Sequence, residues 1–219
     1  MIVRVRQHVN PLSRQYQTAM VPPDWSGVYH HPQFPLHLDI GCGRGSFLLE
    51  MAQLHHHWNF LGVEIRQTLV AAANHHRTEL GLTNLHYLFC NVNPSLVGLL
   101  TSLPSSLSFV SIQFPDPWFK KRHQKRRVVQ PELVDTLGRY LKPGGVVFLQ
   151  SDVREVAIDM VDQFAFHPAF SLEGGETLPQ KGDDGQWILI NPLPVATERE
   201  RSTLERGGFV YRQLFKKNI

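Results

Sequence analysis

The sequence has few cysteines and no long apolar run. Only Cys42 and Cys90 are present, far apart along the chain, which excludes a disulfide framework and fits a reducing compartment. No stretch approaches the roughly 18 consecutive apolar residues that a membrane span needs, and residues 1–35 lack the apolar core of a secretory signal. We therefore expect a cytoplasmic protein with no membrane partner.

The net charge is also small, because the chain has 22 Lys and Arg residues and 19 Asp and Glu residues. The run KKRHQKRR at 120–127 alone holds six cations, so the rest of the chain is slightly acidic. Such a local basic stripe indicates a phosphate-bearing partner. With 219 residues and 42% hydrophobic content, the chain is predicted to be a single globular domain, either as a monomer or as a homodimer.

Three segments follow one another within this domain. Residues 1–35 contain five prolines, resist regular structure, and form either a surface tail or an arm that closes over ligands. Residues 36–166 form a cofactor-binding core. Residues 167–219 form a C-terminal segment on the substrate side, beginning with a Gly-, Asp- and Pro-rich stretch at 174–194.

Short apolar runs alternate with helix-like segments in the core. Strands are predicted at 36–40, 60–65, 85–90, 107–114 and 145–152, with two more candidates at 170–173 and 209–215, and helices at 46–54, 66–80, 130–141 and 153–166. Parallel strands that are apolar on both faces need helices on both sides. The pattern predicts an α/β fold with a doubly wound, mostly parallel seven-stranded sheet, of the Rossmann-like type.

The first predicted strand runs into a glycine loop, DIGCGRGSF, with Gly41, Gly43 and Gly45. Such a turn brings backbone N–H groups and a helix N-terminus up to a ligand. The spacing is G-x-G-x-G, whereas dinucleotide-binding folds use G-x-G-x-x-G. It resembles the loop of class I S-adenosylmethionine-dependent methyltransferases.

Acidic and amide side chains follow the predicted strands at the same edge. Asp39 precedes the glycines, and Glu64 closes the second strand, where an acid can accept hydrogen bonds from both ribose hydroxyls. Asn91 could read the adenine edge or cap a turn. Carboxylates from Asp39, Glu64 and Asp116 suit the cationic sulfonium of S-adenosylmethionine better than a pyrophosphate.

FPDPW, after the fourth strand, continues into the basic run as FPDPWFKKRHQKRR. Prolines on both sides restrain Asp116 before any ligand arrives. The stretch resembles the signature of the bacterial tRNA (guanine-N7-)-methyltransferases, FPDPW-x-K-x-RH-x-KRR, from Phe114 through Arg127. The glycine loop, SDVREVA (151–157) and TERE (197–200) follow the same family's order. The resemblance covers residues 36–219.

The resemblance implies methyl transfer from S-adenosylmethionine to N7 of a guanine in the variable loop of tRNA. It places Asp39, Glu64, Asn91 and Asp116 at the cofactor, and the substrate nucleotide at Asp116, Lys120, Asp152 and the Thr197–Glu200 segment. Two residues depart from the family pattern, because Arg199 stands where an aromatic residue is usual and Asn91 where relatives often have an acid. Thr197 and Glu200 also form the T-x-x-E pattern of a helix capping box.

Asp116 is the predicted catalytic residue. Guanine N7 carries a free lone pair, so the enzyme needs to align the reactants rather than to remove a proton. A carboxylate can accept hydrogen bonds from guanine N1–H and N2–H₂ and offset the positive charge that forms on the purine. The cations of the basic run, among them Arg122, Arg126 and Arg127, are expected to contact RNA phosphates.

Alternatives remain at this stage. An amino-directed adenine or cytosine methyltransferase would have two prolines before its aromatic residue, and a non-catalytic RNA-binding module would not need the glycine loop. The glycine spacing disfavours a nicotinamide dehydrogenase. Histidines 30–31, 55–57 and 75–76 are consecutive and lack metal-ligand spacing, so no metal is expected.

Overall fold

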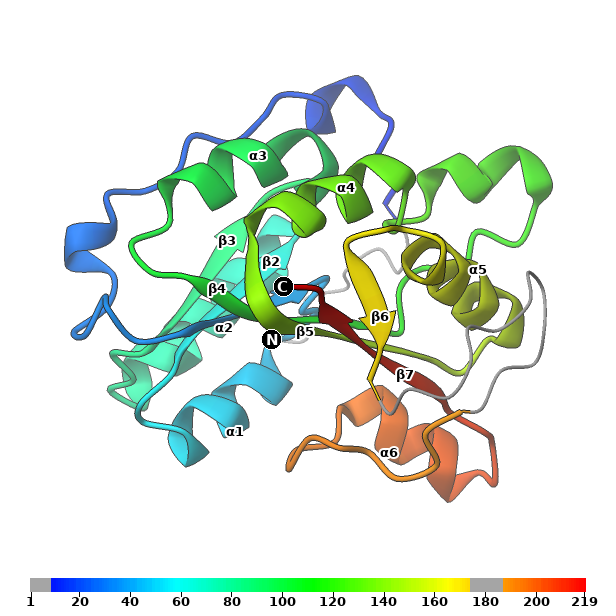
Figure 1. Cartoon of the computed structure of the whole chain (residues 1–219). Helices are drawn as coiled ribbons and strands as arrows, with labels where there is room; N and C mark the ends of the chain where they lie inside the picture. Colours follow the sequence, from blue (N-terminus) through cyan, green and yellow to red (C-terminus); the bar gives the residue numbers. More distant parts are fainter. Residues whose placement is uncertain (1–8, 174–186) are drawn as a thin grey trace.

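The five core strands form the parallel part of one sheet in the computed structural model, which describes residues 9–173 and 187–219 (Figure 1). The strand order is β3-β2-β1-β4-β5-β7-β6, and β7 runs antiparallel to both of its neighbours. The bounds are β1 Leu36–Ile40, β2 Asn59–Glu64, β3 Leu85–Phe89, β4 Leu107–Gln113, β5 Leu141–Ser151, β6 Phe170–Leu172 and β7 Tyr211–Lys217. The predicted mostly parallel, seven-stranded sheet is confirmed for the described residues.

Helices cover both faces of this sheet, as Figure 1 shows. They are α1 Ser46–Leu54, α2 Gln67–Glu79, α3 Val92–Ser102, α4 Pro131–Tyr140, α5 Arg154–Ala165 and α6 Glu198–Glu205. One apolar cluster joins alternate residues of the central strands to α3, α4 and α5, and a second joins Phe60, Leu85 and Tyr87 to α1 and α2. The sheet is therefore doubly wound, and its ligand edge lies at the carboxyl ends of β1, β2 and β4.

Helix α3 was not predicted from the sequence, because Pro94 and Gly98 interrupt the pattern. Pro94 lies in the first turn of α3, where backbone N–H groups have no partner within a helix, so a proline costs little there. Leu96, Leu99 and Leu100 are buried while Val97 is 48% exposed. Burial of this apolar face stabilises the helix in spite of its glycine.

Residues 9–35 pack against the core more closely than a surface tail would. Trp25 and Tyr29 stack with ring centroids 5.9 Å apart and are both buried in the main apolar cluster. The Trp25 indole N–H donates to Ser102 Oγ at 3.1 Å, and the Tyr29 hydroxyl donates to the Phe60 carbonyl at 3.1 Å. Two short 3₁₀ turns, Arg14–Tyr16 and Trp25–Gly27, are the regular structure of this described part.

Candidate cofactor and nucleotide site

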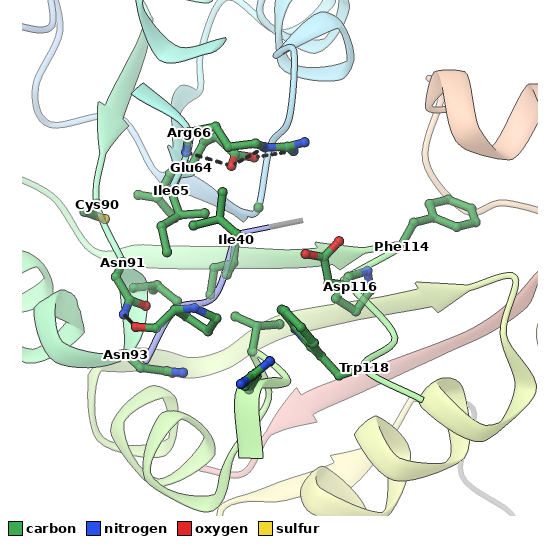
Figure 2. A pocket seen from close by; sticks show the side chains of 18 residues that line it. Ile40, Glu64, Ile65, Arg66, Cys90, Asn91, Asn93, Phe114, Asp116 and Trp118 are labelled. Atoms are coloured by element: carbon green, nitrogen blue, oxygen red, sulfur yellow. Dashed lines mark hydrogen bonds and ion pairs between the residues drawn. The ribbon is translucent and has the colours of Figure 1, made fainter. Parts of the chain in front are cut away.

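Two cavities open at the ligand edge of the sheet. The inner cavity lies between the ends of β1, β2 and β3 and the N-terminal segment, with Ile40, Val63, Asn91 and Val9 among its walls (Figure 2). The outer cavity, about 830 Å³, extends from Asp39 and the glycine loop to Asp152 and Thr197. The two share a wall made of Gly41, Arg66, Phe114, Pro115 and Asp116. A ligand that fills both must therefore pass Asp116.

The glycine loop lies between the two cavities and depends on positive φ angles. Gly41, Gly43 and Gly45 have φ of 81°, 58° and 80°, a region that is costly for residues with a side chain. At Gly45 space is limiting as well, since a Cβ atom would lie 2.7 Å from the ring of Tyr87. The Tyr87 hydroxyl also donates to the Gly45 carbonyl at 2.7 Å. The loop is thus fixed in the conformation that leads into α1.

Glu64 holds the other side of the glycine loop. Its Oε2 accepts a hydrogen bond from the Gly43 N–H at 3.0 Å, and its Oε1 accepts from the backbone N–H and Nε of Arg66 at 3.0 and 2.9 Å. Figure 2 shows the Arg66 guanidinium extended along this carboxylate. Hydrogen bonding to Glu64 raises the pKa of Arg66. Arg66, which the sequence analysis did not select, lines both cavities.

Asn91 connects the inner cavity to the N-terminal segment. Its Nδ2 donates to the carbonyl oxygens of Pro11 and Tyr16, both at 3.0 Å. A carboxylate at this position could only accept hydrogen bonds and would face two carbonyl oxygens. Asn91, with Val9 and Pro11, lines the inner cavity. The described part of the N-terminal arm therefore contributes to the site wall.

Asp39 is 3% exposed and lines the outer cavity. Its Oδ1 accepts from Ser111 Oγ at 2.6 Å and from Gln113 Nε2 at 3.2 Å. Burial raises the pKa of Asp39 to about 6, although these two hydrogen bonds act in the opposite direction. A cationic ligand group beside Asp39 would offset that burial.

Asp116 lies on a turn with an unusual backbone. Phe114 and Trp118 have φ of 50° and 43°, and such positive φ angles are energetically unfavourable for bulky residues. The Phe114 N–H donates to the Gln150 carbonyl at 2.8 Å, and Arg127 Nε donates to the Pro117 carbonyl at 2.9 Å. The turn is thus fixed at both ends, and Figure 2 shows the Asp116 carboxylate between Phe114 and Trp118, facing the cavity.

The basic run forms a 3₁₀ helix, Lys121–Arg126. Four of its cations are exposed, at positions 120, 121, 122 and 125. Arg126 lies over the Trp118 ring, with 4.9 Å between Cζ and the ring centroid. Arg127 is different, because it is only 4% exposed and bonds to Glu155 and Asp159 at 2.6 and 3.1 Å. The structure brings the exposed cations beside the Asp116 turn and places Arg127 behind it.

Asp152 and Thr197 line the outer cavity together with Asp116. Asp152 Oδ2 accepts from Arg199 Nε at 2.8 Å, so Arg199 forms an ion pair at the cavity wall. Thr197 Oγ1 accepts from the Glu200 N–H at 3.1 Å, which confirms the N-cap half of the predicted capping box, while the Glu200 side chain bonds to Arg212 and Asn191 instead. Glu200 itself is 1% exposed and pairs with Arg212 at 2.7 Å. It lies behind the cavity wall rather than in it.

Within residues 9–173 and 187–219, no three His, Cys, Asp or Glu side chains converge as ligands of a metal ion. No helix in these two ranges combines the length and apolar character needed to cross a bilayer.

Comparisons with known proteins agree with this geometry. Residues 33–213 match a family model described as a putative methyltransferase. A tRNA (guanine-N(7)-)-methyltransferase of Nostoc sp. is 58% identical over 99% of this chain and 95% of its own, and one of Trichormus variabilis is 59% identical over 98% and 96%. The similarity thus extends into the first 35 residues, beyond the range that the sequence motifs covered. A solved structure titled StiE O-MT residues 942-1257 aligns with a TM-score of 0.51 at 15% identity, over 84% of this chain and 68% of that one, and supports the fold. The chain belongs to the tRNA (guanine-N(7)-)-methyltransferase family.

Proposed function

We propose that the protein transfers the methyl group of S-adenosylmethionine to N7 of a guanine in tRNA. The observation that carries the proposal is the position of Asp116 in the wall shared by the two cavities. An adenosine in the inner cavity and a purine in the outer cavity would meet at this residue. A tRNA substrate also places the enzyme in the cytoplasm.

The residues present fit S-adenosylmethionine. The N–H groups of Gly41, Gly43 and Gly45 already donate to Val63, Glu64 and Cys42, so the loop shapes the site rather than binding the ligand through them. The start of α1 suits polar groups of the ligand, and Ile40, Val63 and Val92 provide apolar walls for an adenine. Asp39 lines the outer cavity, and among the described residues its Oδ2 has no recorded partner. Bound S-adenosylmethionine would supply an electrophilic methyl group on a sulfonium.

Asp116 and the outer cavity would select and align the guanine. The Asp116 carboxylate accepts from N1–H and N2–H₂, which adenine does not offer in this arrangement. It also offsets the positive charge that develops on the purine as N7 is methylated. Correct alignment of two bound reactants can supply on the order of 7–11 kcal/mol. Asp152 and Thr197 also line the outer cavity and would contact the nucleotide.

The exposed cations would hold the tRNA backbone. Lys120, Lys121, Arg122 and Lys125 lie on the surface next to the Asp116 turn, and phosphate contacts supply much of the affinity for nucleic acids. Arg126, stacked on Trp118, could meet either a phosphate or a base. The prediction that Arg127 and Glu200 contact RNA directly remains untested, and their burial favours supporting roles.

The test is transfer from radiolabelled S-adenosylmethionine to bulk tRNA, followed by digestion to nucleosides. We expect the label in 7-methylguanosine, at least 100-fold less with Asp116→Ala, and S-adenosylhomocysteine binding within about threefold of the original. Asp135→Ala, at a surface carboxylate of α4 that is 59% exposed, is the matched control and should keep full activity. Label in N6-methyladenosine, or unchanged transfer by Asp116→Ala, would refute the proposal.

A further inference from the structure

Buried polar side chains form a continuous hydrogen-bonded chain across four neighbouring strands. Arg212 Nε on β7 donates to Gln150 Oε1 at 3.2 Å, Gln150 Nε2 on β5 donates to Gln113 Oε1 at 2.7 Å, and Gln113 Nε2 on β4 donates to Asp39 Oδ1 at 3.2 Å. The sheet register explains the contacts, because Gln113 is the partner of Gln150, and Gln150 the partner of Arg212. None of the four is more than 9% exposed.

The direction of this chain is determined by its ends. A guanidinium can only donate hydrogen bonds, and an ionised carboxylate can only accept them. Rotating the Gln113 amide by half a turn would place its oxygen against Asp39, and rotating Gln150 would place its NH₂ group against Arg212. Each glutamine therefore has one satisfied orientation, in which its NH₂ group points toward Asp39.

Both ends of the chain are anchored. At the β7 end, Glu200 neutralises Arg212 at 2.7 Å and also accepts from Asn191 Nδ2 at 2.8 Å. At the β1 end, Ser111 Oγ donates its only proton to Asp39, so His37 Nε2, 2.8 Å from Ser111 Oγ, must be the donor in that contact. Burial lowers the pKa of His37 to about 3, which keeps its ring neutral.

The chain engages only one of the two carboxylate oxygens of Asp39. Both recorded hydrogen bonds to Asp39, from Ser111 and Gln113, reach Oδ1. A half turn of the carboxyl group would only exchange two equivalent oxygens, whereas any smaller rotation would weaken both bonds. Oδ2 is left without a recorded partner among the described residues on a side chain that lines the outer cavity, and we infer that it is available to a cationic group of a ligand.

Stability alone does not account for this arrangement. A buried polar chain needs every member satisfied, and apolar side chains of similar volume are often equally stable or more stable in such positions. Two leucines in place of Gln113 and Gln150 would fill the sheet face without the cost of desolvating two amides. What leucines could not do is hold Asp39 in one orientation.

We propose that Gln113 and Gln150 are positioning residues, which hold Asp39 so that Oδ2 accepts a hydrogen bond from the ammonium group of the methyl donor's amino-acid part. The inference rests on the proposed function for the identity of that ligand. It assigns the recognition of the amino-acid part to a chain of contacts that extends to Glu200 behind the nucleotide side of the cavity.

The test compares two ligands, of which only one has the amino-acid part and with it the ammonium group. S-adenosylhomocysteine carries it, and 5′-methylthioadenosine lacks the amino-acid part. Their dissociation constants are measured by calorimetry at pH 8 for the original protein, Gln113→Leu and Gln150→Leu. The matched control is Gln213→Leu, a glutamine-to-leucine change on β7 that is 6% exposed and lies outside the chain.

We expect Gln113→Leu to weaken S-adenosylhomocysteine about tenfold and 5′-methylthioadenosine less than twofold, with a smaller selective loss for Gln150→Leu and none for Gln213→Leu. If Gln113→Leu fails to fold, Gln150→Leu carries the comparison. Equal losses for both ligands, or unchanged S-adenosylhomocysteine affinity, would overturn the inference. Failure of the original protein to bind either ligand, or to methylate tRNA, would instead contradict the proposed function.

Discussion

Arg127 offers the sharpest distinction between support of the Asp116 turn and contact with RNA. It is the last cation of the basic run, yet it is 4% exposed and donates to the Pro117 carbonyl, Glu155 and Asp159. We expect Arg127→Met to destabilise the fold and to slow methyl transfer, because Pro117 follows Asp116 directly. The salt dependence of tRNA binding should not change.

The size of the effect follows from the three contacts. The Glu155 and Asp159 side chains are 55% and 37% exposed, so solvent screens both ion pairs and each is worth about 0–1 kcal/mol. The charged donor to the Pro117 carbonyl contributes about 1–3 kcal/mol. The sum is about 1–5 kcal/mol, and its middle value of roughly 3 kcal/mol lowers Tm by roughly 6–12 °C for a chain of this size.

The assay measures three quantities for Arg127→Met and for Arg122→Gln, an exposed cation of the same run. They are Tm, kcat at saturating tRNA, and the slope of log affinity against log salt between 50 and 200 mM. Each phosphate contact contributes about 0.9 to that slope. We expect Arg122→Gln to lower the slope by about one with Tm unchanged, and Arg127→Met to lower Tm and kcat with the slope unchanged. The opposite pattern would refute the supporting role of Arg127.

Three further predictions concern the donor side of the site. Asn91→Asp should release the N-terminal segment, because a carboxylate cannot donate to the Pro11 and Tyr16 carbonyls; hydrogen exchange at 11–16 should rise at least tenfold, and unchanged protection would contradict the contact. Affinity for S-adenosylhomocysteine should increase about tenfold from pH 5 to pH 7. The pKa of Asp39 is raised to about 6, so below pH 6 the carboxyl group is mostly protonated and uncharged and cannot attract the ammonium group. Asp39→Asn should abolish this pH dependence, and a calorimetric titration series that shows it unchanged would exclude Asp39 as its source. Gly45→Ala should lower Tm by more than Gly81→Ala in thermal denaturation. Both glycines have positive φ, but only at Gly45 would a Cβ atom lie 2.7 Å from Tyr87. Equal losses of Tm would show that the Tyr87 ring moves aside without cost.

Much of the fold could be predicted because apolar strands and their loops carry local signals. The bounds of β1 and α1 agree with the predicted 36–40 and 46–54, since a buried run and a glycine loop limit them clearly. Strand β5 begins at Leu141 rather than 145, because Pro143 and the two glycines after it read as a turn. Strand β7 lies two residues later than predicted, since its register is set by pairing with β5, a contact distant in sequence.

The site was predictable where the chemistry lies in one short motif. Asp39, Glu64 and Asp116 face the same edge because parallel strands end together there. The sequence could not show which charged residues form ion pairs with each other. Arg127 and Glu200 look like ligands in the sequence, but each is buried against charged partners at least 12 residues away along the chain. Arg66 was missed because nothing local shows that its guanidinium returns to Glu64.

The acidic and the basic side chains of this site differ in their exposure to solvent, and so in how strongly salt screens them. Asp39 and Glu64, at 3% and 4% exposure, lie where solvent ions screen an interaction poorly, whereas the cations from Lys120 to Lys125 lie on the surface where salt screens them strongly. In the proposed function, attraction of the polynucleotide would thus be a surface effect, and recognition of the small cationic donor by Asp39 an interior one. The basic run follows Asp116 after only three residues. RNA and donor would therefore bind close together, but through different charged residues. Salt that releases the RNA should therefore leave the donor bound, because Asp39, the carboxylate proposed to face it, is withdrawn from the solvent that carries the ions.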